Sequence, residues 1–462
     1  MKKVKIGLLP LYVKLYDDNS PSMRPRIEEF TETIKGMFSS RNDVELVAGE
    51  ICRLENEFAE AVALFEKENV DSIVTLHLAY SPSLESEKAL KNTNLPIVIL
   101  DTTPTFDFTY NQDNDVISYN HGIHGVQDMC NLLIRNGKKF YIEAGHYLES
   151  DVIERVVKRV KGIKAATSFK NSAVGSIGGS FAGMGDFVVS KEEFEKIGIT
   201  IKMMTPDDAK LISSKVDDDE IENLIASDKE KYIVSEDLSD EELRYSARGS
   251  LTVRKWIEEN NLSAFTANFL TITKDFGIYG MPFAEANRSM ERGIGFAGEG
   301  DVLTAALVGA LMSVSDEASF IEMFCPDWKE NMIYLSHMGE MNTALTAVKP
   351  RFMAKPMVYS DVDTTWICGT YKEGVATIIN LAPCADGKFR IIASKVDMLA
   401  PDCDKLRSGS TCGWFKPQNS ISTFLEDYSK LGGTHHLSLV YGDMRKMAEA
   451  FADSMGFEFY EI

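Results

Sequence analysis

The sequence predicts an α/β protein, with parallel Rossmann-like sheets in its N-terminal and central domains and a β-rich C-terminal domain. Three observations predict this fold class. Roughly the first 150 residues alternate short apolar runs with amphipathic stretches, the order expected of parallel strands joined by helices. A glycine-rich stretch then occupies residues 175–187, and from about residue 320 strand-like runs are separated by turn residues, as in a β-rich domain.

The N-terminal domain is expected to contain five buried strands, because five short runs are rich in branched apolar residues. They lie at residues 4–9, 44–48, 72–76, 97–100 and 140–144. Helical spacing predicts helices at 24–38 and 54–68. Ligands gather at the carboxyl ends of strands in such sheets, so the loops at 76–80 and 101–104 are expected at a binding edge.

The length of 462 residues suits two or three domains of ordinary size. The dense glycines of 175–187 indicate unusual backbone angles or close approach, and they mark a boundary. Acidic runs at 217–220 and 237–242 are expected to be exposed helix faces. We therefore expect domains at 1–170, 171–318 and 319–462, the last with strands at 364–370, 374–381 and 389–396.

Composition excludes several classes of partner and compartment. With 70 acidic and 49 basic residues the net charge is -21, which disfavours nucleic acid and anionic lipid surfaces. No run approaches the roughly 20 apolar residues of a membrane helix. The seven cysteines are odd in number and never form C-x-x-C, so neither a disulfide scaffold nor a cysteine-bound zinc is expected. This cysteine pattern fits a reducing cytoplasm best. The opening residues have the basic start of a secretory signal but no cleavage site follows, and they are expected to form a first buried strand.

Acidic and histidine residues in unusual contexts are the candidates for chemistry. Glu299 lies between two glycines, which leave its carboxylate free to project, although a simple turn acid is the commoner explanation. Glu322 lies inside an apolar run, where a carboxylate is costly to bury unless it is paired or metal-bound; the alternative is a strand-edge residue facing water. His337 lies in a similar run and, taken alone, would more often be a hydrogen-bonded core histidine.

The pair His435 and His436 follows a Gly-Gly-Thr loop and is one of the few places with histidine in this chain, which has seven. Adjacent imidazoles point in different directions, so one can ligate a metal while the other has a second role. The residues alone leave open which one ligates. Two carboxylates and two imidazoles suit Mn²⁺, Co²⁺ or Mg²⁺ better than Zn²⁺, but spacing does not establish that the four converge.

At these positions the sequence resembles the L-arabinose isomerase family across most of its second half. Residues 293–301 read G-I-G-F-A-G-E-G-D and 304–307 read T-A-A-L, similar to the family's G-Y-G-F-G-x-E-G-D-W-K-T-A-A-L. F-I-E at 320–322 is similar to its F-M-E, S-H-M at 336–338 to its A-H-M, and G-G-T-H-H at 432–436 to its G-G-A-H-H. The resemblance implies one divalent cation per subunit, with Mn²⁺ foremost, and an acid/base pair formed by Glu299 and Glu322. The implied metal ligands are Glu299, Glu322, His337 and His436.

Weaker matches extend the resemblance to the sugar site. I-H-G at 123–125 resembles the family's A-H-G, A-F-T-A-N-F at 264–269 resembles a segment whose last residue lines the sugar pocket, and residues 184–186 lie near its G-D-N-M segment. The implied substrate-binding residues are His124, Met184, Phe269 and His435. The resemblance also implies a homotrimer or homohexamer with active sites at subunit interfaces, where the histidine of I-H-G reaches a neighbouring subunit.

Departures from the family leave the sugar open. The family's N-terminal G-S-Q-H-L-Y-G is P-L-Y-V-K-L-Y at 10–16, and its D-Y-T-Y is M-F-C-P at 323–326. We therefore expect a metal-dependent isomerase that converts a pentose, hexose or deoxyhexose through an enediolate.

Two other functions compete with the isomerase. Residues 293–298 also satisfy G-x-G-x-x-G, but a dinucleotide site needs a preceding strand, whereas 285–292 has helical spacing. A sugar-binding protein without catalysis is the other alternative, and it would not need four metal ligands.

Overall fold

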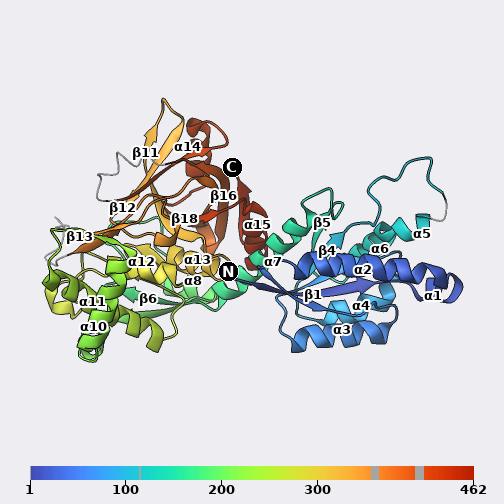
Figure 1. The fold of residues 1–462 in the computed structure, drawn as a ribbon, viewed down its shortest axis with the longest axis horizontal. Coiled ribbons are helices and arrows are strands. Elements are labelled where there is room, and N and C mark those ends of the chain that lie inside the picture. Colours follow the sequence, from blue (N-terminus) through green and yellow to red (C-terminus); the bar gives the residue numbers. More distant parts are fainter. Residues whose placement is uncertain (1, 114–115, 355–363, 401–409) are drawn as a thin grey trace. The chain divides into compact units, whose positions relative to one another are not determined.

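The computed structural model describes residues 2–113, 116–354, 364–400 and 410–462, and the chain divides into two compact units, Met1–Lys164 and Ala165–Ile462 (Figure 1). The first unit is built on a five-stranded parallel sheet with the order β2-β1-β3-β4-β5. Its strands are β1 (Val4–Leu11), β2 (Val44–Ala48), β3 (Ser72–His77), β4 (Ile97–Asp101) and β5 (Tyr141–Ala144). All five strands expected from the sequence are confirmed.

Helices cover both faces of this sheet, because the side chains of β1 alternate between them. Ile6 and Leu8 belong to a core formed with α2 and α7. Leu9 and Leu11 belong to a second core, formed with α3, α4 and α6. The helices are α1 (Lys14–Asn19), η1 (Pro21–Met23), α2 (Arg24–Ser39), α3 (Glu55–Lys67), α4 (Ser83–Asn92), α5 (Ile117–Asn120), α6 (Gly122–Arg135) and α7 (Val152–Lys170).

The second unit begins with a four-stranded parallel sheet, in the order β10-β9-β6-β7. Its elements are β6 (Ala173–Ile177), α8 (Lys191–Lys196), β7 (Thr200–Met204), α9 (Pro206–Ser213), α10 (Asp218–Lys231), α11 (Asp240–Glu259), β9 (Ala264–Ala267), η3 (Lys274–Phe276), α12 (Phe283–Glu291), β10 (Gly295–Gly298) and α13 (Val302–Met312). Every residue of α13 is buried, as expected of a helix that is apolar on all sides. This helix contacts β9 and β10 on one side and β11 and β18 of the following sheet on the other.

The C-terminal part of this unit is a seven-stranded, largely antiparallel sheet with the order β15-β18-β11-β12-β17-β16-β19. β15 also pairs with β16, so the pairing of six strands closes into a ring, and β19 adds to β16 in parallel. The strands are β11 (Ala318–Asp327), β12 (Met332–His337), β15 (Gly374–Pro383), β16 (Phe389–Met398), β17 (Thr411–Pro417), β18 (His436–Tyr441) and β19 (Glu458–Glu461). The β-rich character expected of this part is confirmed.

A small sheet and the remaining helices complete the second unit. The sheet has the order β14-β13-β8. The remaining elements are β8 (Ile233–Val234), η4 (Thr343–Leu345), β13 (Arg351–Ala354), β14 (Thr365–Cys368), η5 (Ala385–Gly387), α14 (Ile421–Lys430) and α15 (Arg445–Met455). The fold class is thus confirmed, whereas the division into three domains stays a prediction.

Three further expectations can be compared with the structure. The G-x-G-x-x-G pattern at 293–298 overlaps β10 and follows α12. It therefore lacks the strand followed by a loop that a dinucleotide site has. Six cysteines are free thiols, and Cys403 lies outside the described residues. Within the described part of the chain, no helix has both the length and the apolar character needed to cross a membrane.

Candidate metal and active site

Glu299 follows β10 in a tight glycine-flanked turn. Its φ is +62°, a left-handed value that is strained for a residue with a Cβ and occurs most often at functional sites. A Cβ on Gly298 would lie 3.0 Å from Cε1 of His337, and one on Gly300 would lie 2.2 Å from the Gly179 carbonyl oxygen. The two glycines therefore allow the close approach that brings this carboxylate into the second unit's interior.

Asp301 joins the start of α13 to the site. Its Oδ1 accepts a hydrogen bond of 2.9 Å from the Thr304 amide and caps the helix. Its Oδ2 lies 2.9 Å from Nδ1 of His436, and the carboxylate is fully buried. One side chain thus caps a helix and fixes an imidazole.

Strand pairing brings the next residues together. β11 and β18 pair so that Glu322 lies directly opposite His436, and Oε1 of Glu322 is 2.7 Å from Nε2 of His436. His337 is the last residue of β12, and its Nε2 lies 3.4 Å from the same Glu322 oxygen. The ring of Phe320 packs edge-on against both imidazoles, at centroid distances of 5.1 Å and 5.0 Å, which fixes their planes.

His337 and His436 share one pattern of partners. Nδ1 of His337 lies 2.6 Å from Oε2 of the buried Glu340, just as Nδ1 of His436 lies beside Asp301. A carboxylate beside Nδ1 fixes the ring so that Nε2 points inward, which is the arrangement found behind metal-bound histidines. Both Nε2 atoms face Glu322.

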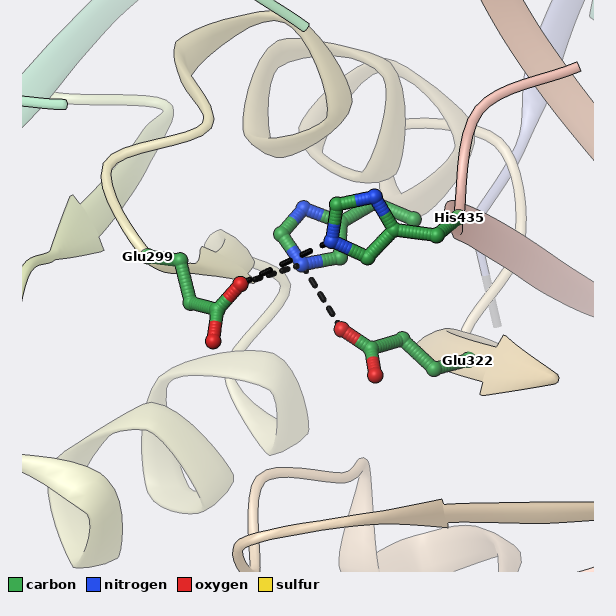
Figure 2. A group of neighbouring side chains, drawn as sticks. Glu299, Glu322 and His435 are labelled. Carbon is green, nitrogen blue, oxygen red and sulfur yellow. Dashed lines mark ion pairs between the residues drawn. The ribbon is translucent and has the colours of Figure 1, made fainter. Parts of the chain in front are cut away.

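His435 is more exposed than His436, and its ring faces Glu299 (Figure 2). Asp186 Oδ2 accepts its backbone N–H at 2.9 Å and lies 2.7 Å from its Nδ1, and its Nε2 lies 3.6 Å from Oε2 of Glu299. Next to Asp186, the Phe187 ring stacks on His436 at 5.0 Å. The end of the glycine-rich segment therefore orients one histidine and covers the other.

The electrostatics of the site couple carboxylates to imidazoles. Burial alone would raise the pKa of Glu299, but the His435 and His436 rings outweigh it and lower that pKa to about 2. His337 and His436 likewise hold the pKa of Glu322 well below its ordinary value. Burial would lower the pKa of His337, yet Glu340 and Glu322 raise it to about 10, and acidic neighbours also raise the pKa of His436.

These residues fit a divalent cation. Ligand atoms of four of them, Glu299, Glu322, His435 and His436, all lie within 4.8 Å of one another. Oε2 of Glu299 and Nε2 of His436 are buried and lie 3.5 Å apart in an ion pair, and neither makes a well-aligned hydrogen bond with a described residue, which leaves both atoms able to bind a further group. Mixed carboxylate and imidazole donors suit Mn²⁺, Co²⁺ or Mg²⁺.

The structure and the sequence-based expectation differ on the second nitrogen ligand, beside His436. The tight group contains His435, whereas His337, expected as a ligand, adjoins it through Glu322. The His337 side chain is 5% exposed and the His435 side chain 38% exposed. Which of His337 and His435 ligates therefore depends on which of the two rings turns its Nε2 toward the cation.

The residues expected to bind sugar lie in different places. Phe269 is buried and contacts Phe181 at a ring distance of 5.4 Å, and the Phe181 amide donates to the Glu299 carbonyl at 2.9 Å. Met184 lies half-buried in the segment that leads to Asp186. These two residues therefore belong to the surroundings of the site.

His124 lies in the first unit, on α6. Its Nδ1 is 3.4 Å from Nδ1 of His121, whose Nε2 is 2.9 Å from the Tyr16 hydroxyl. No sequence pattern predicted this Tyr16–His121–His124 contact. The substrate role of His124 stays a prediction.

Several contacts of the site escaped sequence reasoning. Glu340, Phe187 and Phe320 were not singled out, and Asp301 was noticed only as part of a motif. The available signal was weak: an acidic residue three positions after His337 and another two positions after Glu299. Aromatic residues beside buried histidines read as ordinary core.

Comparison with known proteins agrees with the motifs. Residues 184–317 match the L-arabinose isomerase central domain, and residues 317–458 match the L-arabinose isomerase C-terminal domain. The L-arabinose isomerase of Geobacillus thermodenitrificans is 26% identical over 408 residues, which cover 85% of this chain and 80% of the relative. The chain belongs to the L-arabinose isomerase family.

It is a divergent member, and the family makes it an isomerase that interconverts aldoses and ketoses. The L-arabinose isomerase of Levilactobacillus brevis is 25% identical over 415 residues, covering 86% of this chain and 87% of the relative. Among solved structures, a periplasmic solute binding protein from Actinobacillus succinogenes with bound D-allose covers 68% of this chain and 92% of its own at 15% identity and a TM-score of 0.16.

Proposed function

We propose that the chain is a metal-dependent aldose–ketose isomerase that converts a pentose, hexose or deoxyhexose through an enediolate. The observation that supports this most is the convergence of Glu299, Glu322 and His436, whose ligand atoms lie within 4.8 Å of one another, with Nε2 of His337 3.4 Å from Glu322. The family relatives are named for L-arabinose. We leave the sugar as a class, because residues 10–16 and 323–326 depart from the family's motifs.

Glu299, Glu322, His337 and His436 are the residues that we assign to the cation, with Mn²⁺ as the first choice. When bound, it would act as a Lewis acid toward O1 and O2 of the open-chain sugar. His337 is preferred over His435 because its Nε2 is buried against Glu322 and its Nδ1 is held by Glu340. His435, more exposed and held by Asp186, is assigned to the sugar.

Proton transfer falls to Glu299 and Glu322. One carboxylate takes the proton from C2 of the aldose while O1 gains a proton, which gives the enediolate after O2 loses its own. Returning a proton to C1 then leaves the ketose, so no atom is gained or lost. Each carboxylate turns one oxygen toward the histidines (Figure 2). Its other oxygen remains free to accept a proton. A bound cation lowers the basicity of a carboxylate, and coordination through one oxygen alone limits that loss.

Phe269, Met184 and the first-unit residue His124 are assigned to the sugar's surroundings. We further propose a homotrimer or homohexamer in which His124 of one subunit serves the site of another. Mixing His124→Ala with Glu322→Gln subunits tests this: restored activity in mixed oligomers supports shared sites, and a monomeric mass by light scattering contradicts them. The free thiols of the described cysteines support a reducing compartment, and we propose the cytoplasm.

The function is tested by incubating the purified chain with a panel of pentoses, hexoses and deoxyhexoses. Parallel samples contain Mn²⁺, Co²⁺, Mg²⁺ or a chelator, and bound metal is quantified in each. Turnover of one sugar that requires metal supports the proposal and identifies the substrate. Stoichiometric metal without turnover of any sugar would instead favour a sugar-binding protein.

A further inference from the structure

A second concave site lies in the second unit, separate from the residues assigned to the cation. The cavity has a volume of about 380 Å³ and is formed by α9, α11 and residues 274–279. The residues that define its chemistry are Lys210, Ser213, Tyr245, Arg248, Lys274 and Tyr279. None of the candidate metal or sugar residues lines it, so its occupant does not depend on the proposed function.

The lining is positively charged although the chain is strongly acidic. Three cationic side chains and one carboxylate, Asp275, surround the cavity. Neither Lys210 nor Lys274 forms an ion pair with a described residue. The Arg248 guanidinium donates a hydrogen bond of 3.1 Å to the Val216 carbonyl, and its ion pair with Asp218 is long, at 3.5 Å. Like charges around one hollow repel each other, so an anion placed between them would be stabilised.

The walls of the cavity are held by packing. The Tyr245 and Tyr279 rings meet edge to face at 5.1 Å, and the Arg248 guanidinium lies 5.9 Å from the Tyr279 ring centre. Gly277 has a φ of +99°, and a Cβ there would lie 2.6 Å from Cγ of Lys210. The glycine therefore lets this segment close against the lysine stem, which sets one edge of the cavity.

We propose that this cavity binds a small phosphorylated molecule, with its phosphate held by Lys210, Lys274 and Arg248 and its organic part against Tyr245 and Tyr279. A phosphate dianion matches the excess of two positive charges in the lining. Lysine supplies point charges and arginine a planar fork, the usual phosphate partners. The volume exceeds that of phosphate alone and falls at the lower end of the roughly 300–1,000 Å³ typical of small-molecule sites.

The test is calorimetric titration of the full chain with inorganic phosphate, a hexose phosphate, adenosine monophosphate and an unphosphorylated hexose. Lys210→Gln with Lys274→Gln removes two of the three cations. Lys202→Gln with Lys388→Gln is the matched control, because both are exposed lysines outside the cavity. All four lysines are exposed, and surface substitutions usually change stability little, so both double variants are expected to fold.

We expect at least one organic phosphate to bind more tightly than inorganic phosphate, and the hexose-phosphate and nucleotide arms decide which kind of organic part is preferred. The cavity double variant should weaken that binding at least tenfold and the control less than twofold. Binding should also weaken as salt is raised. Failure of every phosphorylated probe to bind, equal binding of the unphosphorylated hexose, or an equal loss in the control would overturn the proposal.

Discussion

Replacing Asp301 by asparagine separates two roles of one buried side chain. Oδ1 caps α13 and Oδ2 faces Nδ1 of His436, and the residue has no exposed surface through which water could enter. If the new amide oxygen keeps the cap, the amide NH₂ faces Nδ1, and the imidazole must move its proton to Nε2. If the amide flips, its NH₂ faces the Thr304 N–H, so two donors meet.

Both outcomes have a cost that follows from this geometry. Loss of the partner behind a metal-bound histidine weakens metal binding by about 10- to 100-fold, or roughly 1.4–2.7 kcal/mol. The flipped amide would instead lose a cap of about 1 kcal/mol and leave a buried N–H unpaired. We therefore expect one of two losses: Mn²⁺ binding weaker by about 10- to 100-fold if the cap is kept, or a free energy of unfolding lower by about 1–2 kcal/mol if the amide flips.

Calorimetric titration with Mn²⁺ and urea unfolding measure the two effects. Asp217→Asn is the matched control, because Asp217 caps α10 through the Glu220 amide at 2.8 Å and is exposed. The control should bind Mn²⁺ like the wild type. If Asp301→Asn binds Mn²⁺ within twofold of the wild type and also keeps the wild-type free energy of unfolding, Asp301 holds neither His436 nor α13 and the account of the site is refuted.

Three further outcomes are expected. Arg288→Met should lower the free energy of unfolding in urea by about 3–5 kcal/mol. In the wild type Arg288 pairs with the buried Asp228 through two hydrogen bonds, and the variant leaves that carboxylate without its partner. An unchanged urea midpoint of unfolding would contradict this. Burial would raise the pKa of Asp43, but Arg41 and Lys161 lower it to about 2. Asp43→Asn should therefore lower the free energy of unfolding by about 1–2 kcal/mol above pH 4, and by progressively less as the pH falls toward 2. A difference between variant and wild type that does not change with pH would contradict the pairing. Chelation should lower the melting temperature, since Mn²⁺ at 100 times its Kd adds about 2.7 kcal/mol to the free energy of unfolding, and identical melting curves would contradict a folded-state metal site.

The sheets were predictable from the sequence because their strands carry strong local signals. The run Val44–Ala48 has the observed bounds of β2, and the apolar run that begins at Val4 became β1, two residues longer than expected. Short runs of branched apolar residues indicate parallel strands that are buried on both faces. The closure of the C-terminal sheet through β15 and β16 was not predictable, because strand partners far apart in sequence leave no local pattern.

The candidate site also has residues that the sequence could predict and residues that it could not. Glu322 and His337 stand out because polar side chains in apolar runs are costly, and the pairing of Glu322 with His436 then explains how distant residues meet. The supporting Glu340 could not be found, because its role depends on which way the His337 ring faces. His435 was recognised without the Asp186 contact that fixes its direction.

The isomerisation rate of the Glu322→Gln variant tests the central claim most directly, measured on the sugar that the wild type converts and with Mn²⁺ occupancy determined in the same samples. Glu317→Gln is the control, because Glu317 is exposed, lies just before β11 and pairs with Lys372. Loss of a positioned acid/base group predicts a fall of about 10²–10⁴ in kcat for Glu322→Gln and no change for the control. Wild-type turnover by a Glu322→Gln variant that is folded would contradict the assignment of this carboxylate to the reaction.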